Sequence, residues 1–329
     1  MQTTKNSAYT IIRINIAYTT GILLWVPLQI FFGDRWWLLY IANTLAIYLF
    51  LPLIGQLLSG LWLRQKTIWI CFGTVLLIGG YYFGALFLPK SHNQTSAKSI
   101  TVMTSNVLKT KENADAVIAS IKKANADVVA IQELNPVIAK SIQEELIAEY
   151  PYQILEPSPS YDGMGLLSKY PLSPEDVVFS ENWLVGIPQA YELDFDGEKI
   201  LVINFHAIPP YESPEYFKLA NNIRNDQVEE LLSLIRKQEI PAIALGDLNA
   251  TEKNEAYQLM TSQMFDTWRE KGLGLGNTRI NLVDYLPPKW LVRIDYVFHS
   301  QELETNTVEI GPWDGHSDHR PVVAELTLK

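Results

Sequence analysis

Cysteine is almost missing from this sequence: Cys71 is the only one among 329 residues. A single cysteine excludes an intrachain disulfide, so cysteine usage neither supports nor opposes an oxidising compartment. The histidines and Cys71 also lack the closely spaced ligand pattern of a structural zinc site. The sequence contains no glycine-rich phosphate loop, no internal repeat and no low-complexity tract. These absences exclude a P-loop nucleotide site and a repeat architecture.

Charged side chains are scarce in the first part of the chain. Residues 1–90 hold only seven of them, with a net charge of +5, whereas the whole chain carries −10. Residues 91–329 therefore carry −15. The sequence thus divides into an apolar, slightly basic head and a strongly acidic body, in keeping with about two domains for this length.

The head contains three charge-free apolar runs, Ile14–Phe32, Trp36–Leu58 and Thr67–Pro89. Each reaches the roughly 20 residues that a helix needs to cross a bilayer. Tryptophans near their ends suit the membrane–water interface. Three runs in succession argue against a buried helical core, and a cleaved signal peptide would show one shorter run. We predict three transmembrane helices in residues 1–90, a linker over 91–99 and a folded domain over 100–329.

The lysines and arginines of the short loops predict the orientation of these helices. Lys5 and Arg13 precede the first run, and Arg64 with Lys66 follows the second, whereas the first loop has one arginine beside one aspartate. Basic loops stay on the cytoplasmic side. We therefore expect a cytoplasmic amino terminus and, after three spans, an extracytoplasmic body.

The body shows alternating strand and helix patterns. Helices are expected near Glu112–Ala124, from Asn135 to about Tyr150, from Ser213-Pro214 to about Lys237, and over Asn254–Met260. The expected strands are Ile100–Val107, Asp127–Leu134, Gly163–Ser168, Tyr191–Phe195, Lys199–His206, the run from Ile240 into Gly246-Asp247, Arg293–Phe298 and Val322–Leu328. Asp196-Gly197 reads as a hairpin turn. The pattern predicts an α/β domain.

Polar side chains stand where many of these strands end. Asp247 and Asn249 are two residues apart, so in extended chain they point the same way. Each such residue also has a plainer interpretation: a turn for Asp247, a helix cap for Glu133, a structural hydrogen bond for His206. The set is Asn106, Glu133, His206, Asp247, Asn249, Asp295, Asp318 and His319.

This set of side chains contains no thiolate and no activated serine. Carboxylates and carboxamides are hard oxygen ligands, which suit Mg²⁺ or Mn²⁺ held together with water and substrate phosphate. A hard cation, a water-orienting acid and a histidine are the groups that hydrolysis at phosphorus requires. The residues therefore favour a metal-dependent phosphohydrolase.

At this point the sequence resembles the endonuclease/exonuclease/phosphatase superfamily, also called the DNase-I-like fold. The resemblance covers residues 100–329 and rests on six motifs in the family order. These are Ser-Asn106, Gln132-Glu133, His206, Gly-Asp247-Leu-Asn249, Ile-Asp295-Tyr and Ser317-Asp318-His319-Arg320-Pro321. It implies a four-layer α/β sandwich, two central sheets covered by helices.

The resemblance also implies roles for the residues. Glu133 would be the main metal ligand, completed by Asn106 and Asp318. Asp247 would position or deprotonate the water, and Asn249 would orient the phosphate. His206 and His319 would bind phosphoryl oxygens, with Asp295 fixing the tautomer of His319. Whether Asp247 or His319 is the formal base, and whether one metal or two act, stays open.

Departures from the nuclease members affect the substrate prediction. Leu108 stands where repair nucleases carry an aspartate. The His206-Ala-Ile-Pro-Pro stretch, the Arg224-Asn-Asp-Gln227 helix and the three leading runs are similar instead to a membrane-bound branch that includes glycopeptide-resistance proteins. The first hypothesis is a membrane-anchored, metal-dependent phosphohydrolase of a lipid-linked phosphate. The second is an extracytoplasmic nuclease, which a body of −15 disfavours. A third, a catalytically dead binding domain, would need a broken catalytic position, and none is found.

Overall fold

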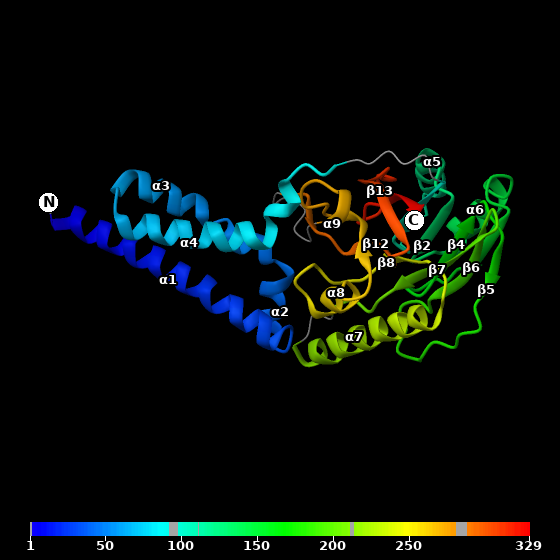
Figure 1. Cartoon of the computed structure of the whole chain (residues 1–329), viewed down its shortest axis with the longest axis horizontal. Helices are drawn as coiled ribbons and strands as arrows, with labels where there is room; N and C mark the ends of the chain where they lie inside the picture. Colours follow the sequence, from blue (N-terminus) through cyan, green and yellow to red (C-terminus); the bar gives the residue numbers. More distant parts are fainter. Residues whose placement is uncertain (1, 92–97, 111, 211–213, 281–287) are drawn as a thin grey trace. The chain divides into compact units, whose positions relative to one another are not determined.

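The computed structural model describes residues 2–91, 98–110, 112–210, 214–280 and 288–329, and the chain forms two compact units, Met1–Leu88 and Pro89–Lys329 (Figure 1). The first unit is helical throughout its regular elements. The second is a mixed α/β unit. Each is described by itself below.

The first unit contains three helical stretches long and apolar enough to cross a membrane, Asn6–Phe32, Ala46–Leu63 and Lys66–Phe87. Its elements are α1 (Gln2–Phe32), α2 (Trp37–Thr44), η1 (Ala46–Phe50), α3 (Leu53–Leu63), α4 (Lys66–Phe83) and η2 (Gly84–Phe87). The number of candidate spans agrees with the sequence prediction.

The boundaries predicted for the second span, Trp36–Leu58, are wrong. Residues 37–44 form the separate short helix α2, and the candidate span begins at Ala46 and continues to Leu63. Asn43 is fully buried, donating to Asp34 Oδ1 (2.9 Å) and accepting from Trp25 Nε1 (3.0 Å). These hydrogen bonds hold α2 against α1, which a count of apolar residues does not reveal.

The second unit contains two six-stranded sheets with the strand orders β13-β14-β1-β2-β4-β3 and β5-β6-β7-β8-β12-β9, beside a two-stranded ribbon, β10-β11. The strands are β1 (Ser99–Asn106), β2 (Val128–Gln132), β3 (Tyr152–Glu156), β4 (Met164–Ser168), β5 (Leu172–Pro174), β6 (Gln189–Phe195), β7 (Glu198–His206), β8 (Ala242–Asp247), β9 (Phe265–Asp266), β10 (Arg279–Ile280), β11 (Trp290–Val292), β12 (Asp295–His299), β13 (Leu303–Ile310) and β14 (Val322–Leu328). The helices are α5 (Ala114–Ala124), α6 (Pro136–Glu145), α7 (Pro214–Lys237), α8 (Glu255–Met260) and α9 (Thr267–Lys271).

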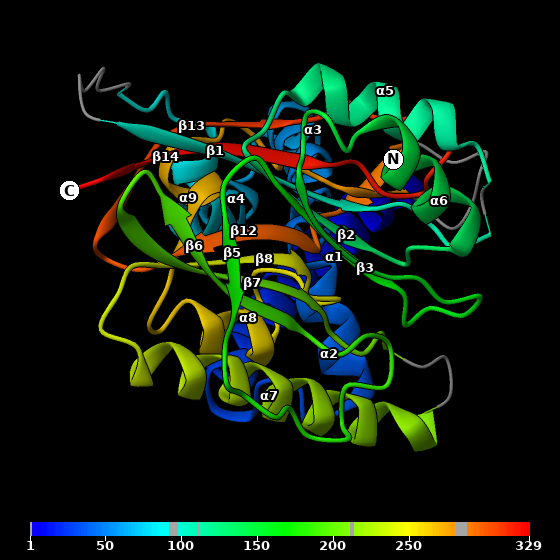
Figure 2. The same ribbon diagram turned by 90° about the vertical axis from the view of Figure 1, so that its right-hand side faces the viewer.

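Successive side chains of a strand point to opposite faces of its sheet, so one strand contributes to two hydrophobic cores. On β2, Val128 and Ala130 pack with Val202 and Leu245 between the two sheets, while Val129 and Ile131 pack under α5 and α6. On the far face of the other sheet, residues of β7, β8 and β12 pack against α7 and α8. Figure 2 shows α5 and α6 on one side and α7 and α8 on the other, with both sheets between them. The fold is therefore the predicted four-layer α/β sandwich.

The register brings many strand ends together at one edge of the sandwich. β1 and β2 run parallel and pair Asn106 with Gln132, and β7 and β8 run parallel and pair His206 with Asp247. β12 is antiparallel to β8, so it starts where β8 ends, and Asp295 pairs with Asp247. Side chains distant in sequence thus meet at this edge, called the catalytic edge below.

Candidate active site

Asn106, Glu133 and Asp247 form the centre of the site. The Asn106 amide donates to Glu133 Oε1 (3.1 Å) and to Asp247 Oδ2 (3.2 Å), and so joins the two sheets. Glu133 Oε2 accepts the backbone N–H of Lys109 at 3.2 Å. Glu133 and Asp247 are only 7% and 1% exposed. Two carboxylates are thus held close together in a desolvated place, which favours a bound cation.

The backbone around these residues is constrained. Leu108, Glu133 and Asn249 have φ values of 57°, 57° and 52°, a left-handed conformation that side chains other than glycine adopt rarely. Gly246 lies where a Cβ atom would come within 1.9 Å of the Phe205 carbonyl oxygen. Residues in sparsely populated backbone conformations cluster at functional sites when the surrounding structure fixes them. Here they turn Glu133 and Asn249 towards the catalytic edge.

His206 and Asn249 lie on opposite sides of Asp247. His206 Nε2 is 3.7 Å from Asp247 Oδ2, and His206 Nδ1 is buried without a hydrogen-bond partner among the described residues. The Asn249 backbone N–H donates to Asp247 Oδ1 (2.8 Å), and its amide group donates to the Ala207 carbonyl (3.0 Å). The Asp247 carboxylate is thus fixed from two directions.

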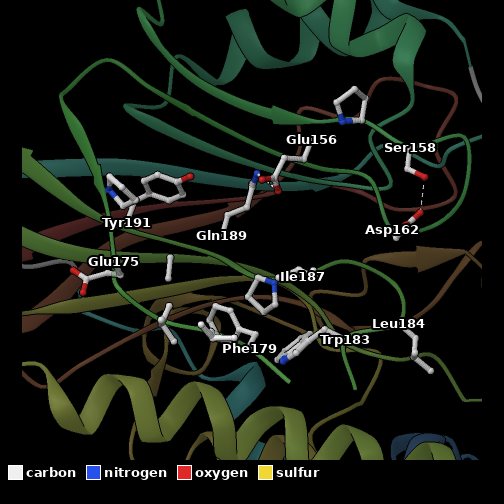
Figure 3. Close-up of a pocket in the computed structure, with 16 residues that line it drawn as sticks. Glu156, Ser158, Asp162, Glu175, Phe179, Trp183, Leu184, Ile187, Gln189 and Tyr191 are labelled. Atoms are coloured by element: carbon white, nitrogen blue, oxygen red, sulfur yellow. Dashed lines mark hydrogen bonds between the residues drawn. The ribbon is translucent and has the colours of Figure 1, made fainter. Parts of the chain in front are cut away.

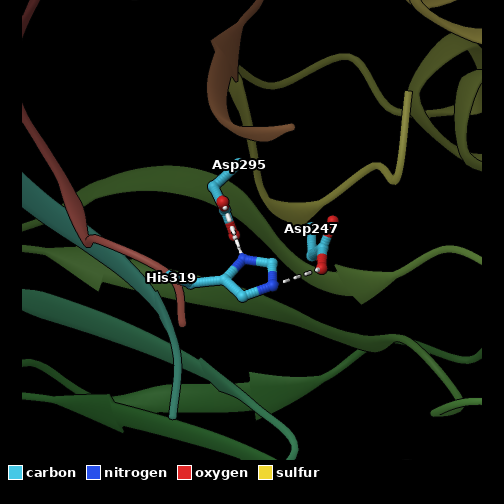
Figure 4. Close-up of side chains that lie close together, drawn as sticks. All are labelled: Asp247, Asp295 and His319. Atoms are coloured by element: carbon cyan, nitrogen blue, oxygen red, sulfur yellow. Dashed lines mark hydrogen bonds and ion pairs between the residues drawn. The ribbon is translucent and has the colours of Figure 1, made fainter. Parts of the chain in front are cut away.

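Asp295, His319 and Asp247 form a chain of interacting groups (Figure 4). Both Asp295 oxygens lie within hydrogen-bond distance of His319 Nδ1, at 3.0 and 2.9 Å. The other ring nitrogen, Nε2, faces Asp247 Oδ2 at 3.8 Å. The Asp295 backbone N–H is held by the hydroxyl of Thr278 at 3.2 Å. Since Asp295 is engaged by the imidazole, these three side chains work better as an acid–histidine relay than as three ligands of one metal.

Burial and neighbouring charges shift the pKa values of Asp247 and His319. Burial raises the pKa of Asp247, and the nearby Asp295 carboxylate raises it further, against His319, His206 and the Asn249 N–H, which lower it. Burial lowers the pKa of His319, but the carboxylates of Asp295 and Asp247 outweigh burial and leave that pKa raised. Both shifts favour the protonated forms, which makes Asp247 a stronger base and keeps the His319 imidazolium at higher pH.

Ser317, which the sequence analysis did not single out as functional, joins the last motif to the first. Its hydroxyl donates to the Asn106 carbonyl at 2.6 Å and accepts the His319 backbone N–H at 3.0 Å. Its place inside the Ser317-Asp318-His319 motif was the only signal in the sequence. Ser317 is therefore a positioning residue for both Asn106 and His319.

Asp318 lies apart from the Glu133 centre. One of its oxygens pairs with Arg279, and the other is 3.9 Å from His319 Nε2. Glu133, Asn106, His206, Asp247, Asn249, Asp295 and His319 are joined by the contacts described above, whereas Asp318 reaches the set only through His319. As a metal ligand Asp318 stays a prediction, one that would require it to leave Arg279.

The donor set fits a hard divalent cation. Glu133 offers a carboxylate whose present partners are two N–H donors, and Asn106 can offer its amide oxygen after releasing the Leu108 N–H. Mg²⁺ is held in proteins by one or two carboxylates plus water and phosphate oxygens. Among the described residues, Glu133 can supply one carboxylate ligand and Asn106 one amide-oxygen ligand, and water and phosphate oxygens would fill the other positions.

A buried amide network lies below the site, between the sheets. Gln132 Nε2 donates to Asn204 Oδ1 (2.7 Å), and the Asn204 amide donates to Gln189 Oε1 (3.0 Å). Gln189 in turn donates to Glu156 at 3.1 Å. Buried polar groups with every partner in place fix a unique arrangement, so this network sets the relation of β2, which precedes Glu133, to β7, which ends at His206.

Gln189 and Glu156 also line a groove of about 800 Å³ (Figure 3). One of its lining residues, Ser158, donates its backbone N–H to the carbonyl of Leu134, which follows Glu133 in the chain (2.9 Å). Its lining includes exposed apolar side chains and the carboxylates of Glu156, Asp162 and Glu175, and it includes no lysine, arginine or histidine. Such a lining is unfavourable for a polyanion.

Two sheets in a four-layer sandwich, with acid, amide and histidine side chains at one edge, define the class: the DNase-I-like α/β sandwich. Residues 103–319 match the model of the Endonuclease/Exonuclease/phosphatase family. The chain belongs to this family, whose members hydrolyse phosphoester bonds and usually use divalent metals. Among curated proteins, none matches the sequence.

Solved structures with the same fold include TDP2 proteins. Truncated Caenorhabditis elegans TDP2 is 18% identical and covers 70% of this chain and 97% of its own, with a TM-score of 0.53. D. rerio TDP2 complexed with a single-strand DNA product is 16% identical, covers 70% and 99%, and has a TM-score of 0.56. The endonuclease/exonuclease/phosphatase from Bacteroides vulgatus is 18% identical, covers 70% and 100%, and has a TM-score of 0.53. At these identities the likeness establishes the fold alone.

Proposed function

We propose that this protein is a membrane-anchored, divalent-metal-dependent phosphohydrolase that cleaves a phosphoester or pyrophosphate bond of a lipid-linked substrate. The observation that carries the reaction type is the position of Asp247. It lies between the Glu133–Asn106 pair and the His319–Asp295 pair, and its carboxylate is within 3.2 to 3.8 Å of Asn106, His206 and His319. Candidate metal ligands and candidate proton-transfer groups thus face one small volume.

Different residues would supply the separate functions that an in-line displacement at phosphorus requires. A divalent metal at Glu133 and Asn106 would offset phosphate charge and stabilise the developing oxyanion. Asp247, with its raised pKa and the fixed Asn249 N–H behind it, orients the attacking water and accepts its proton. Protonated His319, held by Asp295, and His206 donate hydrogen bonds to phosphoryl oxygens.

The choice of a lipid-linked substrate rests on three features. The chain carries three candidate membrane spans ahead of the catalytic unit. Residues 91–329 carry −15, which repels a soluble polyanion, and the groove lined by Gln189 and Glu156 has no basic side chain among its described lining residues. A tether to the bilayer also raises the effective concentration of a lipid phosphate. The predicted extracytoplasmic location is part of this proposal.

A nuclease is the second candidate, favoured by one observation. The fold neighbours include a TDP2 structure complexed with single-strand DNA product. That observation concerns another protein, and the same site chemistry would serve either phosphodiester.

The test is a hydrolysis panel on purified full-length protein in lipid vesicles, using a prenyl pyrophosphate, phospholipids and supercoiled plasmid at equal phosphate concentration. We expect release of phosphate or a phosphorylated headgroup from a lipid to exceed plasmid nicking, and chelator to abolish both. Asp247→Asn is the matched inactive control because it keeps the volume of the side chain. Efficient nicking with no turnover of any lipid phosphate would favour the nuclease instead.

A further inference from the structure

A cluster of tryptophan and basic side chains stands beside His319 and takes no part in the chemistry described above. The Trp290 and Trp313 rings meet edge to face, with centroids 5.1 Å apart. The Arg320 guanidinium lies 4.5 Å from the centre of the Trp290 ring, and the Lys289 ammonium 4.3 Å from that of Trp313. Lys289, Trp290, Trp313 and Arg320 are called the tryptophan–cation cluster below.

The cluster is built into the catalytic edge. The Trp313 indole N–H donates to the Ser317 carbonyl at 2.9 Å, and Ser317 positions both Asn106 and His319. Trp290 is the first residue of β11, which pairs with β10. Arg279 of β10 forms an isolated backbone β-bridge with His319. Any surface that meets this cluster therefore lies beside the active site.

Charge and shape indicate what the cluster meets. Lys289 is exposed and both tryptophans are half-buried, and among the described residues neither Lys289 nor Arg320 forms an ion pair with a carboxylate. Tryptophan rings with long basic side chains over them are typical of the membrane–water interface, where the ring enters the headgroup layer and the cation stays in water.

The chain itself brings the cluster near the bilayer if the spans are membrane-inserted. Lys90 and Ser91, which follow the third candidate span, are held against α9 by hydrogen bonds from Lys90 to Arg269 (2.5 Å) and from Lys271 to Ser91 (2.7 Å). From Lys271 the chain reaches Arg279 in eight residues, or at most about 28 Å. The chain between Lys271 and Arg279 folds back onto α9, because the indole N–H of Trp268 in α9 donates to the Gly274 carbonyl at 3.0 Å.

We propose that the tryptophan–cation cluster is a docking surface for the lipid headgroup layer of the membrane in which the spans lie. Docking there places the catalytic edge against the plane of lipid phosphates. The inference rests on the proposed membrane anchoring, but it does not depend on which phosphate is cleaved. Single-stranded nucleic acid would need open aromatic faces for base stacking, and cations already cover one face of each ring in the cluster.

Site-directed fluorescence on the full chain tests this proposal. Replacing the sole cysteine, Cys71→Ser, allows one polarity-sensitive label at Pro288→Cys, an exposed position beside Lys289. The matched control is Glu239→Cys, exposed before β8 at the end of the strand opposite Asp247. Both labelled proteins are reconstituted into phosphatidylcholine vesicles, prepared with and without phosphatidylglycerol. In both preparations the vesicles contain phosphatidylcholine with a nitroxide quencher on its headgroup.

We expect several-fold stronger quenching and a blue shift for the label at 288 relative to the label at 239. Lys289→Glu should weaken the quenching, whereas Lys237→Glu, the same charge reversal on the exposed end of α7, should not. Equal melting temperatures of the two variants would show that the fold is intact. Co-flotation with the vesicles reports insertion of the spans, so failure of anchoring is seen separately.

Two results would overturn the proposal. One is equal quenching at 288 and 239 in protein that floats with vesicles. The other is a label at 288 that responds to a single-stranded oligonucleotide but not to the quencher lipids, which would assign the cluster to nucleic acid. Lipid turnover without quenching at 288 would remove the docking surface and leave the proposed reaction standing.

Discussion

The burial and hydrogen bonds of Glu133 are the main support for the proposed metal site. Its carboxylate is 7% exposed and is held by the N–H groups of Asn106 and Lys109. No arginine or lysine side chain among the described residues forms an ion pair with it. A buried carboxylate of this kind is stabilised by a cation when one is bound.

Glu133→Gln is therefore expected to keep the fold and to raise the Mg²⁺ concentration needed for half-maximal rate by about 10-fold or more, as the loss of a metal-site carboxylate would. The measurement is a Mg²⁺ titration of phosphohydrolase activity at fixed substrate. Glu145→Gln, an exposed site at the end of α6, is the matched control. Unchanged Mg²⁺ dependence in Glu133→Gln would contradict the metal assignment.

His319 is expected to titrate above the ordinary histidine pKa of about 6.5, because the Asp295 and Asp247 carboxylates favour the imidazolium more than burial opposes it. The raised pKa stabilises the metal-free fold fully below pH 6.5, and this contribution is lost as pH rises through the folded pKa. Asp295→Asn should lower the pKa of His319 and remove most of that contribution. Histidine proton NMR against pH measures the first, and urea unfolding at two pH values the second.

The same pair can be tested by kinetics. Asp295→Asn and His319→Ala should each lower the rate, and the double variant should be little slower than His319→Ala, as for residues that act as a unit. Losses that simply add would show that Asp295 does not act through His319.

At the level of secondary-structure elements, the position of strand β8 depends on Gly246, the glycine before Asp247. The backbones of β7 and β8 pair Phe205 with Gly246, and a Cβ at Gly246 would meet the Phe205 carbonyl oxygen and carbon at 1.9 and 2.8 Å. Neither strand can move alone, because both are covered by α7 and α8. The close approach of these strands is what places Asp247 beside His206.

Gly246→Ala is expected to cost about 1–3 kcal/mol or more of unfolding free energy, as overpacking against rigid neighbours does. Denaturant unfolding of the full chain in detergent measures it. Gly197→Asn in the β6–β7 hairpin is the control, because nothing lies within 4 Å of a Cβ there and asparagine tolerates positive φ. A Gly246→Ala variant as stable as the wild type would show that β7 and β8 separate without cost.

At the scale of the whole molecule, the chain combines an apolar helical unit with an acidic α/β unit. Basic residues stand at the amino-terminal end of the first candidate span, with Lys5 before it and Arg13 inside it near its start. Arg64 and Lys66 stand where the second candidate span meets the third. The positive-inside bias therefore predicts that residues 91–329 lie outside the cytoplasm.

A tag at the carboxyl terminus should be removed by protease added to intact spheroplasts, because the catalytic unit is then on the accessible side. An internal tag between Arg64 and Lys66 should stay protected in the same preparation and serves as the control. Protection of the carboxyl-terminal tag until the membrane is broken would invert the topology and favour a cytoplasmic substrate.

Many elements of this protein could be predicted from its amino acids alone, because periodicity and polar strand ends are local signals. The turn at Asp196-Gly197 and the helix start at Pro136 after Asn135 agree with the structure. The four-layer sandwich also agrees, but it was implied by the family resemblance rather than by these local signals. Short or edge elements were missed. β3 and β13 lie at the edge of their sheet and alternate weakly, and the helix from Asn135 ends at Glu145, before the predicted Tyr150.

The contacts between polar groups could not be predicted in this way and became known from the folded arrangement of the strands. Six motifs in order imply one site, but no spacing places the Asn106 amide between Glu133 and Asp247, or pairs Asp318 with Arg279. The tryptophan–cation cluster joins Trp290 to Trp313 and Arg320 across strands that pair only after folding. The physical reason is that sequence patterns record the face on which a side chain lies, whereas the partner it meets there depends on strand register and sheet packing.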